Sequence, residues 1–142
     1  MSRFYKLVGK LAVPITTSEY SAWIAIQPND GIVQVCENEY TDGQETIRVS
    51  TVFLMGINHR WMDEEDPLLF ETLVLGGTMN NSQWRYTTWE QAERGHQSVI
   101  EQLMREMPDL KPLKGDPAPL SRENIPTRFA RIIQELCPSQ KN

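Results

Sequence analysis

Three consecutive side chains, His59, Arg60 and Trp61, are of types that together bind nucleotides. They follow a run rich in β-branched residues, so we expect them at the end of a strand. An indole stacks on a flat partner, and a guanidinium binds phosphate through two parallel hydrogen bonds. A hairpin end that carries no ligand explains the same residues more simply. Both interpretations remain open on the sequence alone.

Glu71 and His96 are the other candidates for chemistry. Glu71 interrupts an apolar strand pattern, where an unpaired carboxylate is costly, so we expect a cationic or hydrogen-bonding partner. His96 falls in the apolar stripe of a predicted helix, where it donates to a backbone carbonyl or a carboxylate such as Glu71, or serves as a ligand or general base. With His59 these residues can in principle form an acid/base group. The chain has no nucleophile motif, phosphate-binding glycine loop or metal-ligand spacing, so we do not expect an enzyme.

Metal binding is not expected either. The acidic run at 63–66 lacks the alternating ligands and the glycine of a calcium loop, and it is typical of a solvated loop tip. Cys36 and Cys137 have no metal-ligand spacing and are interpreted as free thiols. We expect no metal and no cofactor.

Two apolar runs, 46–57 and 68–75, predict a pair of adjacent strands that must position these residues. Before them, the sequence predicts a strand at 3–13 that is broken near Gly9 and ended by Pro14. It further predicts a helix from a capping box at Thr16–Glu19 to about Ile26, a strand from Ile32, and a hairpin turn at Asp42 and Gly43.

The second half of the chain predicts a short strand at 83–86 and then the main helix, which begins at one of two overlapping capping boxes in 87–91. Pro108 ends this helix. Gly95 lies inside it and indicates a close approach of backbone or ligand. The resulting fold class is α+β, a small antiparallel sheet packed by one main helix with a C-terminal helical appendage. We divide the chain into a core domain (1–107), a Pro-rich linker (108–121) and an amphipathic helix and tail (122–142).

The predicted tail helix has an apolar stripe that needs a surface to pack against. That surface belongs either to the same chain or to a second subunit, and the sequence alone favours the second. The stripe consists of Phe129, Ile132, Ile133 and Leu136.

Composition narrows the class of protein. The chain has 142 residues, 39% of them hydrophobic and 23% charged, which is ordinary for one globular domain. Its net charge of −5 argues against a broad basic surface for nucleic acid or an anionic membrane, whereas an acidic protein can meet a basic protein surface. No apolar run is long enough to span a bilayer and no signal peptide is evident, so we expect an intracellular protein.

Several motifs resemble a family of small proteins common in phages and prophages. The stretches RVSTVFL, INH, PLLFETLV and RYTTWEQAERGH match that family's V-S-T-V-F/W-L-G-x-D/N-H, P-L-L/I-F-E-T-M-V and R-Y-S/T-T-x-E-E-A-x-x-G-H, and the resemblance covers about residues 3–104. The family branch with an assigned function resembles the Thoeris anti-defence sponge proteins. These sequester cyclic ADP-ribose isomers and other cyclic nucleotide signals without cleaving them. The resemblance implies a homo-oligomer in the host cytoplasm, with ligand pockets at subunit interfaces.

The chain departs from the family pattern in three places: Met55 precedes Gly56, the tip reads MDEEDP rather than being glycine-rich, and the tail after Met107 is additional. The altered tip puts a pocket near it in doubt. The matching positions are Asn58, His59, Phe70, Glu71, Thr72, Arg85, Tyr86, Glu90, Gly95 and His96.

Side-chain chemistry then assigns ligand roles. Arg48 and Arg85 suit phosphate, Tyr86 and Trp61 suit base stacking, and His59 or Glu71 suits hydroxyl recognition. The candidate ligand-binding set is Arg48, His59, Trp61, Glu71, Arg85, Tyr86 and His96.

Three functional classes follow. A sponge that binds a small anionic nucleotide is preferred. A protein-binding inhibitor of a host defence complex, such as an anti-CRISPR, is favoured by the acidic charge and the tail helix. A small hydrolase is the third.

Overall fold

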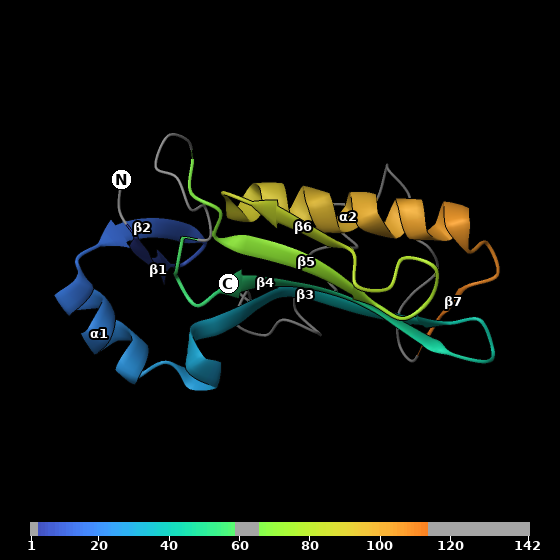
Figure 1. The fold of residues 1–142 in the computed structure, drawn as a ribbon, viewed down its shortest axis with the longest axis horizontal. Coiled ribbons are helices and arrows are strands. Elements are labelled where there is room, and N and C mark those ends of the chain that lie inside the picture. The colour runs from blue at the N-terminus through green and yellow to red at the C-terminus, as the bar shows by residue number, and fades with distance from the viewer. Residues whose placement is uncertain (1–2, 59–65, 114–142) are drawn as a thin grey trace.

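The computed structural model describes residues 3–58 and 66–113 and shows a mixed α+β fold (Figure 1). An antiparallel five-stranded sheet has the order β6-β5-β4-β3-β7. Its strands are β3 (Ile32–Thr41), β4 (Thr46–Leu54), β5 (Phe70–Leu75), β6 (Gln83–Tyr86) and β7 (Lys111–Pro112). The main helix α2 (Trp89–Glu106) packs along one face of this sheet, as predicted. The predicted tail helix and most of the predicted linker lie outside the described residues.

The alternation of β4 decides which face is buried. Ile47, Val49, Thr51 and Phe53 are fully buried toward α2, whereas Arg48 is exposed on the opposite face. The same alternation continues into β5, so the α2 side of both strands forms the core. The sequence pattern of the two central runs is therefore confirmed.

Helix α2 begins at Thr88, whose side chain accepts from the backbone of Gln91 while the Gln91 side chain accepts from the backbone of Thr88. Of the two overlapping capping boxes, this is the one that forms. The helix ends at Met107, whose N–H donates to the Leu103 carbonyl. Its apolar stripe is buried against the sheet through Trp89, Ala92, Val99, Ile100 and Leu103.

The structured core continues beyond residue 107. Leu110 is buried in the cluster that α2 forms with the sheet, and β7 pairs with the end of β3 at Tyr40 and Thr41. The first residues after Pro108 therefore belong to the packed core, since a buried leucine and two paired residues hold them there.

The N-terminal segment forms a hairpin of β1 (Phe4–Val8) and β2 (Leu11–Ile15), followed by α1 (Thr17–Ala25) and the short helix η1 (Pro28–Gly31). The predicted capping box of α1 is present. The prediction that Pro14 ends the strand is wrong, because Pro14 lies inside β2 opposite Tyr5. The Tyr5 N–H donates instead to the Gly56 carbonyl at 2.7 Å, so Pro14 stands where no N–H is needed.

Gly56 is required at this junction between the hairpin and the sheet. Its φ is +74°, and a Cβ built there would lie 2.0 Å from the Tyr5 carbonyl oxygen. Gly43 has a φ of +96° but no heavy atom within 4 Å of its Cβ position. Both glycines therefore have a backbone conformation that favours glycine, and only at Gly56 does a neighbouring atom also exclude a side chain.

We predict that Gly56→Ala destabilises the protein more than Gly43→Ala does. Both substitutions carry the cost of a positive φ, about 1 to 2 kcal/mol, and only Gly56→Ala adds overpacking of about 1 to 3 kcal/mol. Urea unfolding of the two variants and the parent measures the difference. Equal losses would show that the contact between Gly56 and Tyr5 is not a constraint on the fold.

Candidate functional site

The sheet separates the candidate residues into two groups. Tyr86 and His96 lie on the α2 side, whereas Arg48, Glu71 and Arg85 lie on the opposite face. His59 and Trp61 lie outside the described residues. The structure therefore does not bring all the predicted ligand residues into one place.

A chain of hydrogen bonds crosses the core on the α2 side. The Tyr86 hydroxyl donates to Thr72 Oγ1 at 3.1 Å, and Thr72 Oγ1 lies 2.5 Å from Thr51 Oγ1. Thr51 Oγ1 lies 2.7 Å from His96 Nδ1, and His96 Nε2 lies 2.7 Å from Asn38 Oδ1. Every group except Tyr86 is buried, so these bonds join five side chains from four strands and α2 inside the core.

Along this series of hydrogen bonds, every group donates in the same direction, from Tyr86 toward Asn38. Asn38 Oδ1 can only accept, so His96 Nε2 carries the proton and Nδ1 is the acceptor. Thr51 then donates to His96 and accepts from Thr72, which in turn accepts from Tyr86. His96 is thus neutral in one defined tautomer.

Burial lowers the pKa of His96 to about 3, since its side chain is almost completely removed from water. The hydrogen bond that Nδ1 accepts also favours the neutral form. A histidine held in this way cannot exchange protons with a ligand near neutral pH. The geometry therefore makes His96 a part of the core.

Tyr86 packs against α2 where a glycine leaves room for it. A Cβ at Gly95 would lie 2.2 Å from the Tyr86 ring, so the predicted close approach at Gly95 is that of this ring. Burial raises the pKa of the Tyr86 phenol, which keeps its proton available for Thr72. The ring is thereby placed as a packing element of the α2 side.

The alternative in which His96 donates to Glu71 is wrong, because the two side chains lie on opposite faces of the sheet and His96 Nε2 donates to Asn38. Glu71 points to the opposite face, where its Oε2 accepts from Arg85 Nε at 3.1 Å. Since strand neighbours alternate in direction, Thr72 rather than Glu71 faces the histidine. The expectation that Glu71 needs a cationic partner is confirmed.

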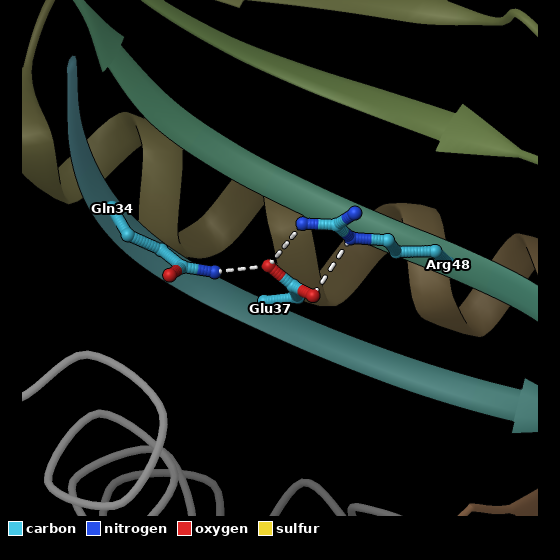
Figure 2. Close-up of polar contacts among 3 residues, drawn as sticks. All are labelled: Gln34, Glu37 and Arg48. Atoms are coloured by element: carbon cyan, nitrogen blue, oxygen red, sulfur yellow. Dashed lines mark hydrogen bonds and ion pairs between the residues drawn. The ribbon is translucent and has the colours of Figure 1, made fainter. Parts of the chain in front are cut away.

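The face of the sheet opposite α2, which we call the outer face, carries a second ion pair. Glu37 of β3 binds Arg48 of β4 through two contacts, Oε2 to Nε at 2.7 Å and Oε1 to Nη2 at 2.9 Å. Figure 2 shows this pair in front of the two strands, with α2 passing behind them. The hydrogen bonds that Arg48 donates to Glu37 also raise the pKa of the Arg48 guanidinium.

An apolar band runs diagonally across the outer face between the two ion pairs. Strand register places its members in neighbouring positions on β3, β4 and β5. Two of them, Ile32 and Leu75, are each 39% exposed, which is high for large apolar side chains. Helix α2 covers the other face, and the main contacts of α1 are with β1 and η1. The band consists of Ile32, Leu54, Val52, Leu73 and Leu75.

Sequence reasoning missed Asn38, Thr51 and Glu37, and it named Thr72 as a position that matches the family pattern without assigning it a role. The two threonines carried a usable signal, because each occupies an inward position between apolar residues of its strand. A hydroxyl at such a position needs a buried partner.

Among the described residues, no group of three His, Cys, Asp or Glu side chains is placed to hold a metal ion, and no helix there is long and apolar enough to cross a membrane. Comparison of the chain with protein-family models, curated proteins and solved structures finds no match.

We predict that His96 makes the stability depend on pH. The unfolded histidine has a pKa near 6.5 and the folded one about 3, so between these values the unfolded chain binds more protons. This contribution is complete above pH 6.5 and is lost as the pH falls, at a limiting slope of about 1.4 kcal/mol per pH unit.

Urea unfolding between pH 7 and pH 5 measures this slope, and comparison of His96→Gln with the parent separates it from the contribution of the carboxylates, among which Glu93 has a pKa raised by burial. His96→Gln should flatten it, whereas His59→Gln, the matched control at the chain's other histidine, should retain it. A slope that persists in His96→Gln would contradict the assignment.

Proposed function

We propose that this protein is a phage-type anti-defence protein that binds a cyclic nucleotide immune signal, a cyclic ADP-ribose isomer or a cyclic oligonucleotide, and sequesters it without cleavage. The motif resemblance suggests this class of ligand. The observation that carries the proposal to particular residues is the placement of Arg48 and Arg85 on the outer face, each oriented by a carboxylate.

The two arginines suit phosphate groups in different ways. Arg85 donates to Glu71 through Nε, which leaves its two terminal nitrogens to donate to a phosphate. Arg48 uses Nε and Nη2 for Glu37 and retains Nη1. In both cases the carboxylate restricts the guanidinium before a ligand arrives, which reduces the entropy lost on binding.

The spacing of the arginines favours a ligand with two separated anionic groups. Arg48 and Arg85 are two strands and four residues apart, which corresponds to about 16 Å between their Cα atoms. One phosphate cannot bind both arginines unless both side chains extend far toward each other. Within the proposed class, a cyclic dinucleotide or larger ring fits this spacing better than the compact pyrophosphate of cyclic ADP-ribose.

The apolar band lies between the two arginines and offers a surface for the bases. Base edges find polar partners beside it in Ser50 and Gln83, which share the outer face. A sheet face forms only one wall of a pocket, whereas small ligands are usually bound in concave sites. A second copy of the chain supplies the opposite wall in the homo-oligomer that the resemblance implies.

Retention of an intact ligand is supported by the separation of the acid and base candidates. Glu71 is paired with Arg85 on the outer face, and His96 is buried on the α2 side in its neutral form. These two residues therefore cannot act together on one bond. The acidic charge of the chain supports a protein-binding inhibitor of a host defence complex as the second candidate.

We predict that Arg48→Gln and Arg85→Gln each weaken nucleotide binding about 10- to 100-fold, since a hydrogen bond to a charged group contributes about 1.5 to 3 kcal/mol. Isothermal titration against cyclic ADP-ribose isomers and cyclic di- and trinucleotides measures the affinity. Arg105→Gln is the matched control, because it removes the same charge at an exposed position in the last turn of α2.

The bound fraction is then released by heat and analysed by chromatography. Unchanged ligand supports sequestration, and altered ligand would replace it with the hydrolase. If no nucleotide produces heat, the sponge is refuted, and capture of a purified defence complex tests the inhibitor.

A further inference from the structure

The described chain ends beside the outer face of the sheet. Strand β7 pairs with β3 at Tyr40 and Thr41, and the Leu113 N–H donates to the Glu39 carbonyl at 2.9 Å. Glu39 lies opposite Arg48 in the strand register, so its side chain belongs to the outer face. The described chain thus ends at the β3–β7 edge of the sheet, which is the exit point for residues 114–142, next to the outer-face side chain of Glu39.

Charge differs in sign between the two parts of the chain. Residues 1–113 hold nine Lys and Arg against sixteen Asp and Glu, a formal charge of −7, whereas residues 114–142 hold five against three, a charge of +2. On the outer face, Glu37 and Glu39 lie on the β3 side of the apolar band, nearest to the exit point. The net positive charge of residues 114–142 is therefore attracted to the acidic side of the outer face, next to the exit point.

The tail sequence complements this face. Its apolar stripe at Phe129, Ile132, Ile133 and Leu136 has helical spacing, and Arg128 and Arg131 lie off the stripe. A single amphipathic helix of this length is marginal in water unless its stripe is covered. The band on the outer face is apolar, and the carboxylate of Glu39 lies on its β3 side, which suits such a helix.

We propose that residues 122–142 dock on the outer face of their own chain, with the apolar stripe on the band and the two arginines on its β3 side, toward Glu39. The eight residues 114–121 reach up to about 27 Å, while β5 lies only about 10 Å from β3. Tethering by a short linker gives an effective concentration in the millimolar range. The exit point therefore favours the same chain over the second subunit that the sequence alone favoured.

Docking of the tail has a consequence for ligand binding. The apolar band lies between Arg48 and Arg85. A docked tail covers this surface, so a nucleotide that binds to the same face must displace the tail. The docking itself does not rest on the proposed function and is tested without any nucleotide.

Methyl NMR of the full-length, ligand-free protein, labelled at leucine and valine, tests the docking. Phe129→Leu removes a ring current, so the methyl signals of Val52, Leu73 and Leu75 should shift. Signals of Val49 and Val74, on the α2 side, should not move and serve as the internal control for an unchanged core. Gln134→Ala is the control in the tail, off the apolar stripe, and should leave the signals of the band in place.

Sedimentation velocity over a range of concentrations distinguishes the same chain from a second copy. A monomer whose band methyls respond to Phe129→Leu supports docking on the same chain. In a dimer, labelled parent chains are mixed with unlabelled Phe129→Leu chains: band signals that stay in place support docking on the same chain, whereas shifted band signals assign the tail to the second copy and overturn the proposal. Unchanged band signals in the labelled Phe129→Leu protein itself, or equal shifts on both faces of the sheet, overturn it as well.

Discussion

The buried hydrogen-bond chain from Tyr86 through Thr72, Thr51 and His96 to Asn38 is the constraint on which the rest of the structure depends. It joins β6, β5, β4, β3 and α2 in the middle of an otherwise apolar core. Leaving one buried partner unsatisfied costs about 1 to 3 kcal/mol, and a slip of one residue in any strand turns its polar group to the other face. Apolar contacts alone do not discriminate between registers so sharply.

This arrangement also determines what the outer face presents. Because the threonines face α2, their strand neighbours Ser50, Val52, Glu71 and Leu73 face outward. The two ion pairs and the apolar band are thus direct results of the register. Binding chemistry and core chemistry occupy opposite faces of the same strands.

Much of the fold follows from local sequence signals. The period-two pattern of 46–57, the capping residues Thr16 and Thr88, and the turn at Asp42 each act over a few residues. Pro14 was misjudged because its position opposite Tyr5 depends on a hydrogen bond to Gly56, about forty residues away. The pattern of one strand does not contain that information.

The candidate site was predictable only in part. The Arg85 partner of Glu71 required knowing which residues lie opposite each other on β5 and β6. The partners of His96 come from β3 and β4, 58 and 45 residues away in the chain. Glu37 was overlooked because nothing in its own neighbourhood distinguishes it from a solvated carboxylate.

The common direction of the donors in the core has an evolutionary consequence. Replacing any one member of the hydrogen-bond chain leaves a neighbouring donor or acceptor without its partner. A single substitution therefore destabilises the protein, whereas a coordinated change of both partners does not. Residues 38, 51, 72, 86 and 96 should therefore vary as a group, together with Gly95, which makes room for the Tyr86 ring. A joint signature at these positions can identify distant relatives whose overall similarity has been lost.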